Sequence, residues 1–201
     1  MPRPLAVAIT GGIGTGKSTA LQLFARHGAA TVSSDEIVHH LLATNEDVRK
    51  ALVAKLGDGI LDDAGQINRK RVGEVVFGDR AKLLWLEQLL HPLVSREYLE
   101  WREQLASLPN APDVVVTEVP LLYESGGETR FDKVVALGAS PRIRARRGRP
   151  VPEERAGRQL PDDEKLARAD FSYVNNGSLE DLSAFVEGVM SQLRHSDAKM
   201  T

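Results

Sequence analysis

The stretch Gly11-Gly12-Ile13-Gly14-Thr15-Gly16-Lys17-Ser18 decides the fold of this chain of 201 residues. It matches the phosphate-binding loop pattern, in which a glycine and any four residues precede Gly-Lys-Ser or Gly-Lys-Thr. Residues 5–10 before it form a short apolar run typical of a buried strand. Residues 18–27 after it contain neither glycine nor proline and predict a helix. Strand, glycine loop and helix in this order are the context that the motif requires, so we expect a nucleoside triphosphate to bind here.

The residues of this loop are suited to holding a polyphosphate. Glycine adopts backbone angles that other residues avoid, so successive amides can turn into one concave nest for an anion. The helix that follows points the positive end of its dipole at the same place. Lys17 adds a full positive charge for the outer phosphates, and the hydroxyl of Ser18 is a ligand for Mg²⁺. The predicted nucleotide-binding residues of the loop are Gly12, Ile13, Gly14, Thr15, Gly16, Lys17, Ser18 and Thr19.

The composition excludes several classes of protein. The net charge is -2, without a basic excess, so we expect no nucleic-acid partner. The absence of cysteine excludes disulfides, thiolate catalysis and cysteine metal sites. No apolar run is long enough to span a membrane, and Met1-Pro2-Arg3-Pro4 leads into the first strand without a signal peptide. We therefore expect a cytoplasmic enzyme whose residues 1–201 form a single domain.

Short apolar runs alternate along the chain with longer stretches of helical pattern. Such alternation predicts an α/β fold with a doubly wound five-stranded parallel sheet, and the phosphate loop after the first strand makes it of the P-loop NTPase type. The predicted strands lie at residues 5–10, 29–33, 114–116, 134–137 and 171–174.

The long stretch between the second and third predicted strands contains no convincing strand of its own. We interpret residues 45–108 as a helical insertion on the substrate side, whose longest helix is interrupted near His91-Pro92. The other predicted parts are a core at about residues 4–44 and 110–195 and a short lid at about residues 141–168.

Two acidic residues follow predicted strands, at the edge of the sheet where ligands of such folds bind. Asp35 comes just after the second strand, where it would either orient a substrate hydroxyl and accept its proton or cap the next helix. Glu118 ends the third strand, where it would either help to hold Mg²⁺ or be an ordinary loop acid. Position alone leaves both alternatives open for each residue.

An arginine-rich segment follows the fourth predicted strand. Arginines on a lid can neutralise the charge that develops on a transferred phosphoryl group. Others would form a solvated helix face paired with neighbouring acids, so we expect most to lie on the surface and about one to three to touch phosphate. The basic residues of this segment are Arg142, Arg144, Arg146, Arg147, Arg149, Arg155, Arg158 and Lys165.

The histidines do not predict a metal site. His39 and His40 are adjacent rather than at metal-ligand spacing. His91 precedes a proline in an apolar helical setting, where a single histidine is more often structural than catalytic.

Taken together, these motifs resemble those of dephospho-coenzyme A kinases over residues 5–193. Many kinases share the phosphate loop, whereas the Pro-Leu-Leu-aromatic-Glu run and the combined Glu-Lys…Ala-Asp…Asn-x-Gly run are more particular. The motifs that carry the resemblance are residues 10–18, Asp35, Leu90-His91-Pro92-Leu93-Val94, residues 118–124, Arg158-Gln159-Leu160, Glu164-Lys165, Ala169-Asp170 and Asn175-Asn176-Gly177-Ser178.

The resemblance implies ATP-dependent phosphorylation of the ribose 3′-hydroxyl of dephospho-coenzyme A, giving coenzyme A and ADP. It further implies that the loop amides bind the β- and γ-phosphates, that Asn175 lies near the adenine, and that the helical insertion embraces the coenzyme A moiety. The residues it assigns are Lys17, Asp35 and Arg147 to catalysis, Ser18 and Glu118 to Mg²⁺, and Asp35, His91 and Leu121 to the substrate.

The sequence departs from the pattern of this family in two places. Ser33 stands where the family commonly has a second aspartate, so two carboxylates are not expected to act together. The lid segment is shorter than usual, so Arg146, Arg147 and Arg149 compete for the role of the arginine on the transferred phosphate.

Other functions remain open on the sequence alone. A P-loop kinase for a nucleoside or nucleotide would keep Lys17, Ser18 and Asp35 without the more particular signatures. A nucleotide-dependent switch would normally carry an Asn-Lys-x-Asp motif, which this sequence lacks. An inactive nucleotide-binding module would not need these three residues intact. We expect a monomer or a weak homo-oligomer with no membrane partner.

Overall fold

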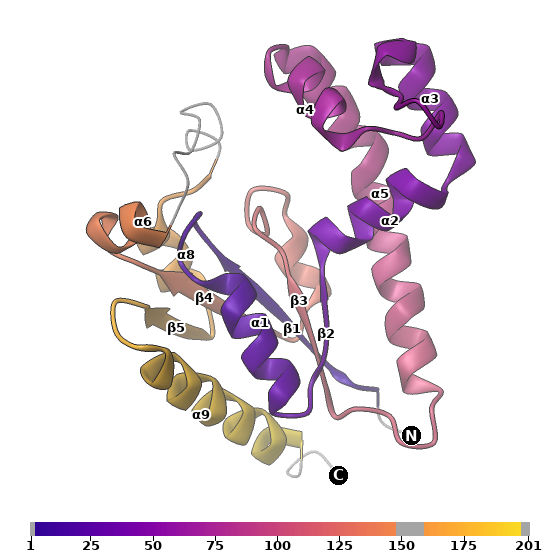
Figure 1. Ribbon diagram of the computed structural model, residues 1–201. Helices are drawn as coiled ribbons and strands as arrows, with labels where there is room; N and C mark the ends of the chain where they lie inside the picture. The colour runs from indigo at the N-terminus through magenta and orange to yellow at the C-terminus, as the bar shows by residue number, and fades with distance from the viewer. Residues whose placement is uncertain (1–2, 148–158, 198–201) are drawn as a thin grey trace. The chain divides into compact units, whose positions relative to one another are not determined.

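The computed structural model describes residues 3–147 and 159–197 (Figure 1). The chain divides into two compact units, and each is described by itself. The first, here called the sheet unit, comprises Met1–Ser33 and Gln104–Thr201. The second, the helical unit, comprises Ser34–Glu103, so it begins earlier along the chain than the insertion expected from the sequence.

The sheet unit is built on five strands, and the prediction of a five-stranded parallel sheet is confirmed. Every strand pair is parallel, and the order β2-β3-β1-β4-β5 places β1 in the centre. The three inner strands are mostly apolar, with polar or charged residues towards their ends, because helices cover both faces of a parallel sheet. The strands are β1 (Leu5–Gly11), β2 (Ala30–Ser33), β3 (Val114–Glu118), β4 (Lys133–Gly138) and β5 (Phe171–Val174).

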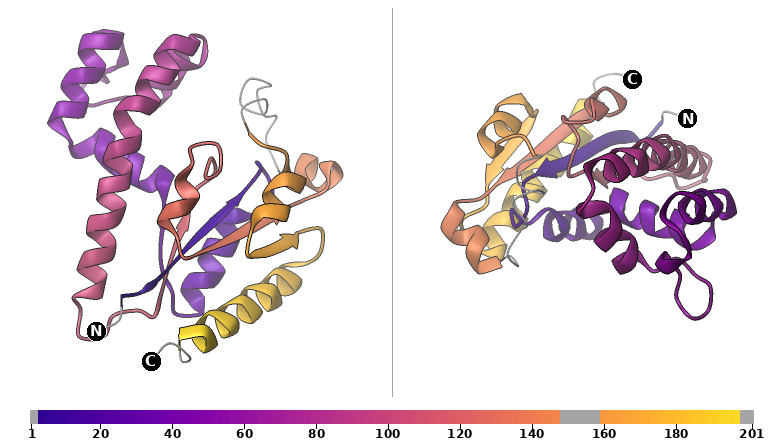
Figure 2. Two further views of the ribbon diagram at one scale, coloured as in Figure 1. Left: turned by 180° about the vertical axis from the view of Figure 1, so that it is seen from behind. Right: turned by 90° about the horizontal axis from the view of Figure 1, so that it is seen from above.

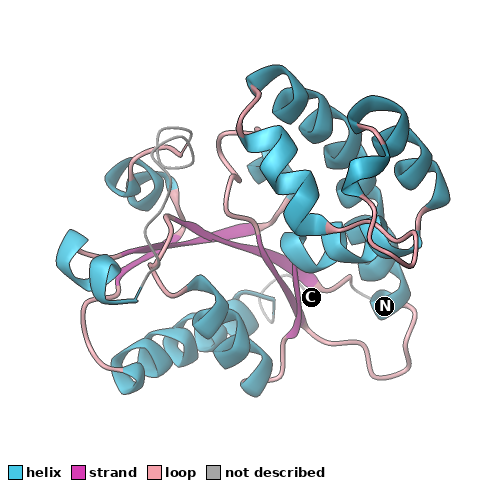
Figure 3. Cartoon of the chain, turned by 45° about the horizontal axis from the view of Figure 1, so that its top comes forward, coloured by secondary structure: helices cyan, strands magenta, loops and turns pink. Residues whose placement is uncertain are grey.

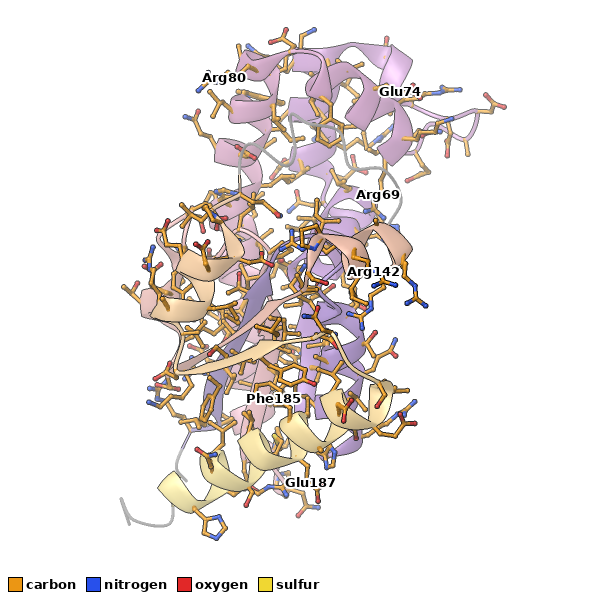
Figure 4. All side chains as sticks on the ribbon, turned by 90° about the vertical axis from the view of Figure 1, so that its left-hand side faces the viewer. Arg69, Glu74, Arg80, Arg142, Phe185 and Glu187 are labelled. Atoms are coloured by element: carbon orange, nitrogen blue, oxygen red, sulfur yellow. The ribbon has the colours of Figure 1, made fainter. Side chains whose placement is uncertain are left out.

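Two helices, α1 (Lys17–Arg26) and α9 (Leu179–Asp197), lie side by side on one face of the sheet (Figures 1 and 2). Because side chains of a strand point alternately to opposite faces, Val7 and Ile9 of β1 pack on this side, in one core cluster with both helices. Figure 4 shows Phe185 of α9 directed towards the sheet, where it stacks on Tyr173 with ring centroids 4.7 Å apart.

The opposite face carries the short helix α8 (Asp162–Arg168), which contacts β1, β4 and β5. A smaller apolar cluster on this side contains Ala8, Leu122 and Tyr123. Among its described residues, the sheet unit also contains the 3-10 helix η2 (Gly127–Arg130) and the helix α6 (Pro141–Arg147), which follows β4.

The helical unit contains helices and loops, without a strand in its described residues (Figure 3). Two of its helices are capped by asparagine: the side chains of Asn45 and Asn68 accept hydrogen bonds from the first amides of the helices that follow them. An apolar core of its own includes Leu52 and Ile60, both fully buried. Its elements are α2 (Ser34–Thr44), α3 (Glu46–Leu56), η1 (Asp58–Ile60), α4 (Arg69–Phe77) and most of α5 (Arg80–Ala106).

The prediction that the helix is interrupted at His91-Pro92 is wrong, because α5 runs through this dipeptide without a break. A proline inside a helix lacks the amide that would bond to the carbonyl four residues earlier. Pro92 lies on the exposed side of α5, where solvent can satisfy that carbonyl. Leu90 and Tyr98 are buried on either side of it, so packing stabilises the helix along its length.

Candidate functional site

The glycine loop occupies the carboxyl end of the central strand, between Gly11 of β1 and Lys17 of α1. Gly14 and Gly16 have φ angles of 77° and 95°, in the left-handed region that favours glycine. A Cβ atom on Gly16 would collide with the side-chain nitrogen of Asn175. The loop therefore requires glycine here for its backbone conformation and for the space beside it.

Hydrogen bonds inside the loop hold it in a curl. The carbonyl of Gly12 accepts from Thr15 Oγ1 at 2.9 Å and from Lys17 Nζ at 3.0 Å. The first bond of α1 joins the amide of Ala20 to the carbonyl of Gly16. Amides before this bond have no acceptor within the helix, so the first turn of α1 is suited to binding an anion.

Lys17 and Glu118 face each other across two neighbouring strand ends. Lys17 Nζ lies 3.9 Å from Glu118 Oε1, and both residues are buried. The register places Glu118 beside Ile9 of β1, and the amide of Val119 bonds to the carbonyl of Ile9 at 2.9 Å. Ser18 is exposed in the first turn of α1. A hydroxyl and a carboxylate of this kind are ligands that Mg²⁺ accepts.

A cavity of about 190 Å³ opens beside the loop, and Asn175 and Arg147 form its polar side. Asn175 donates from Nδ2 to the carbonyl of Thr15 at 2.9 Å. Arg147 donates to Asn175 O at 2.9 Å and to Asn175 Oδ1 at 3.3 Å. Leu179 and Leu182 supply apolar surface. Apolar walls with a few placed polar groups are typical of a small-molecule site.

Asp162 binds the loop from outside, a contact that the sequence did not single out. The amide of Gly12 donates to Asp162 Oδ1 at 3.1 Å, and the same carboxylate pairs with Arg144. Arg144 also donates from Nε to the carbonyl of Ala139 at 3.0 Å, and burial lowers the pKa of its guanidinium. Gly12 and Asp162 are 150 positions apart, so no local sequence pattern could have predicted this contact.

Lys165 is not a surface residue of the lid. Its side chain is fully buried, with Nζ 2.7 Å from Glu124 Oε1 and 2.9 Å from the carbonyl of Pro120. Of the other basic residues, Arg142 and Arg146 are exposed as expected, and Figure 4 shows Arg142 on α6 at the surface. The candidates Arg149, Arg155 and Arg158 lie outside the described residues.

The structure brings together the predicted residues of the sheet unit: the loop, Glu118, Asn175 and Arg147. Leu121 belongs to the same unit, where it is half-buried and its carbonyl accepts from the amide of Ser125 at 3.1 Å. Asp35 and His91 belong to the helical unit, where both are exposed.

Asp35 lies in the first turn of α2, which follows β2 directly. Its carboxylate has no hydrogen-bond or ion-pair partner among the described residues. Neighbouring Ser33, at the end of β2, is in register with Glu118 of β3.

Within the described residues, no three histidine or acidic side chains are grouped to hold a metal ion. A cation at Ser18 and Glu118 would therefore need ligands from a bound phosphate or water. In the same part of the chain, no helix combines the length and the apolar character needed to cross a membrane.

Comparison with known proteins gives concordant matches. The family model described as Dephospho-CoA kinase matches residues 5–181. A dephospho-CoA kinase of Protochlamydia amoebophila (strain UWE25) is 36% identical over 195 residues, which cover 94% of this chain and 96% of that protein.

Two solved structures resemble the whole chain. TT1252 from Thermus thermophilus has a TM-score of 0.76 and 30% identity, covering 96% of this chain and 99% of that one. A dephospho-CoA kinase from Campylobacter jejuni has a TM-score of 0.71 and 27% identity, covering 96% and 98%.

Proposed function

The chain belongs to the dephospho-CoA kinase family, and we propose that its phosphate loop transfers the γ-phosphoryl group of ATP to the ribose 3′-hydroxyl of dephospho-CoA. The products are coenzyme A and ADP. The observation that carries this proposal is the loop geometry, with Lys17 and Glu118 3.9 Å apart at the carboxyl ends of β1 and β3. A buried lysine and carboxylate beside a glycine loop are suited to phosphoryl transfer.

Lys17 is proposed to bind the β- and γ-phosphates. Its ammonium now donates to the carbonyl of Gly12 at 3.0 Å, and phosphate oxygens would replace that acceptor when ATP binds. The amides of Gly14 to Thr19 would complete the anion nest. Charge that develops on the transferred group is then stabilised by donors already in place, which is the main source of catalysis in such sites.

Ser18 and Glu118 are proposed to hold Mg²⁺, Glu118 either directly or through water. The exposed hydroxyl of Ser18 and the buried carboxylate of Glu118 both offer the oxygen ligands that this ion prefers. When bound, Mg²⁺ neutralises charge on the β- and γ-phosphates.

The cavity beside Asn175 is proposed to take the adenine. Asn175 and Arg147 offer polar groups at its edge, and Leu179 and Leu182 offer apolar surface. Arg147 is also the proposed lid arginine, because its guanidinium lies on the border between this cavity and the loop.

Asp35 is proposed to orient the acceptor hydroxyl and to receive its proton. A capping carboxylate precedes its helix and accepts hydrogen bonds from the first amides, whereas Asp35 lies within the first turn of α2 and accepts none from the described residues. An exposed and unpaired carboxylate is available to a substrate hydroxyl. His91 and Leu121 are proposed to lie on the coenzyme A side.

Incubation of the purified protein with MgATP and dephospho-CoA tests the proposal, with ADP and the mass of the acceptor as readouts. We expect ADP in proportion to acceptor and the gain of one phosphate on the 3′-hydroxyl. ATP binding without acceptor phosphorylation would contradict the substrate, and a panel of nucleosides and nucleotides would then identify another one. We further propose that the enzyme acts in the cytoplasm as a monomer or weak homo-oligomer, without a nucleic-acid partner.

A further inference from the structure

Two signature motifs from distant parts of the chain meet at Lys165 of α8. Its side chain is fully buried, and its Nζ donates to the carbonyl of Pro120 at 2.9 Å while pairing with Glu124 Oε1 at 2.7 Å. Glu124 Oε1 accepts a further bond from the amide of Leu160 at 2.8 Å. Lys165 therefore holds the chain between β3 and η2 at two points, Pro120 and Glu124.

The held segment begins at the proposed metal site. Pro120 comes two residues after Glu118, and its carbonyl also accepts from Thr10 Oγ1 at 3.4 Å. Thr10 directly precedes the glycine loop and is fully buried. A displacement of Pro120 would therefore shift both Glu118 and the beginning of the glycine loop.

The same helix also binds the loop itself. Asp162 is one turn before Lys165 on α8, and its carboxylate accepts from the amide of Gly12 at 3.1 Å. This arrangement means that α8 holds the segment after Glu118 with one side chain and the segment before Lys17 with another.

Stability alone does not explain a charged pair at this position. Apolar residues, among them Leu122 and Leu160, pack around the same loop, and an apolar pair of similar volume is often as stabilising as a buried ion pair. A lysine differs from an apolar side chain in that its donors bind one particular carbonyl and one particular carboxylate, which fixes the backbone between them.

We propose that Lys165 is a positioning residue for the metal-binding carboxylate: by holding Pro120 and Glu124 it keeps Glu118 beside Lys17. This inference rests on the proposed function only in assigning Mg²⁺ to Glu118. It assigns Lys165 no contact with substrate.

The test compares the wild type with the double variant Lys165→Met/Glu124→Gln. The double variant removes both charges, so it leaves no unpaired buried charge, and the amide side chain introduced by Glu124→Gln retains an acceptor for the backbone N–H of Leu160. The control is Glu164→Gln, on the same helix, which weakens the exposed ion pair of Glu164 with Arg168, at 3.7 Å.

The readouts are kcat, the free Mg²⁺ concentration that gives half-maximal rate, and the Kd of ATP with and without Mg²⁺. Loss of an outer partner of a metal ligand typically costs about 10–100-fold in metal affinity or activity. We expect the double variant to raise half-saturating Mg²⁺ and to lower kcat, each by about tenfold or more. The Kd of ATP without Mg²⁺ and all values of the Glu164→Gln control should stay within about twofold of the wild type.

Wild-type Mg²⁺ dependence in a folded double variant would overturn the proposal. If thermal melting shows that the double variant is unfolded, the single variant Glu124→Gln replaces it in the test, because it keeps the bond from Lys165 to Pro120 but removes the carboxylate partner of Lys165. We then expect a smaller rise in the half-saturating Mg²⁺ concentration. The absence of any rise would contradict the proposal. If the wild type does not phosphorylate dephospho-CoA, the proposed function fails. The ratio of ATP Kd without and with Mg²⁺ still decides the role of Lys165, because it needs no acceptor.

Discussion

Asn175 donates a hydrogen bond from its side-chain nitrogen to the carbonyl of Thr15, 160 positions earlier in the chain, at 2.9 Å. Asn175 directly follows β5, and Thr15 lies in the loop after β1, so the bond joins an edge strand of the sheet to its central strand end. The buried amide of Asn175 thereby serves both as a support of the loop and as a wall of the adjoining cavity.

Asn175→Ala should weaken both the loop and ATP binding. The change leaves the carbonyl of Thr15 without this donor and removes the acceptor at Asn175 Oδ1 for Arg147. A lost partner at a buried group costs about 1–3 kcal/mol, so we expect that loss in the free energy of unfolding and a raised KM for ATP. Urea unfolding and initial rates measure the two quantities. Asn176→Ala is the control, since it removes a bond to the amide of Ser140 at an exposed position and should leave KM unchanged.

Gly16→Ala should abolish nucleotide binding. Its φ of 95° strains any other residue, and its Cβ would collide with Asn175. Gly57→Ala separates the two effects, because Gly57 has φ of 84° but no atom within 4 Å of its Cβ position. We expect Gly57→Ala to cost about 1–3 kcal/mol of stability from backbone strain alone, because its φ of 84° and ψ of 167° lie in a region that essentially only glycine adopts, with ATP binding intact by calorimetry. Equal ATP affinity in both variants would refute the packing argument.

Lys17→Ala should nearly abolish turnover, because it removes the positive charge beside the γ-phosphate. The measurement is ADP release under saturating MgATP and acceptor. Retained activity would show that this loop is not the active phosphate site.

Asp35→Asn should lower kcat by about 10²–10⁴-fold, the usual size of general-base catalysis. The Kd of ATP should not change, because Asp35 is assigned to the acceptor. Glu36→Gln, on the same exposed turn of α2, is the matched control and should keep the wild-type rate. If Asp35→Asn lowers the melting temperature but leaves kcat unchanged, Asp35 has a structural role and not a catalytic one.

Asp170 should contribute to acid unfolding. Burial opposes ionisation of its carboxyl, but hydrogen bonds from the side chain of Lys133 and the amide of Val134 together hold its pKa below the ordinary 3.8. A lowered folded-state pKa stabilises the protein above the unfolded-state value, and this stabilisation is lost as the pH falls through the folded-state pKa. Asp170→Asn should therefore lower stability near neutral pH and flatten its dependence on pH below about 4. In a plot of urea unfolding midpoint against pH across that range, the wild type should show the steeper slope and the variant the shallower one. Parallel slopes would contradict the role of Asp170 in acid unfolding.

Local patterns in the sequence determined the sheet and the loop. The five short runs became β1 to β5. The inner strands are mostly apolar because they are buried on both faces, whereas the edge strands β2 and β5 are only partly buried. The glycine spacing placed Gly14 and Gly16 in conformations that other residues avoid. The side chains of Asn45 and Asn68 cap the helices that follow them, a common role of asparagine before a helix. All of these features depend on near neighbours along the chain.

Contacts between distant segments were decided by the tertiary structure. Asp162 on the amide of Gly12 and Lys165 on Pro120 and Glu124 join segments whose spacing in sequence carries no signal. The sequence placed Lys165 in a mostly solvated basic segment, whereas packing of α8 on the sheet buries it completely. Packing also carries α5 through Pro92, against its local propensity. A residue's type and neighbours can therefore indicate its chemistry, but burial and long-range partners follow only from how the layers pack together.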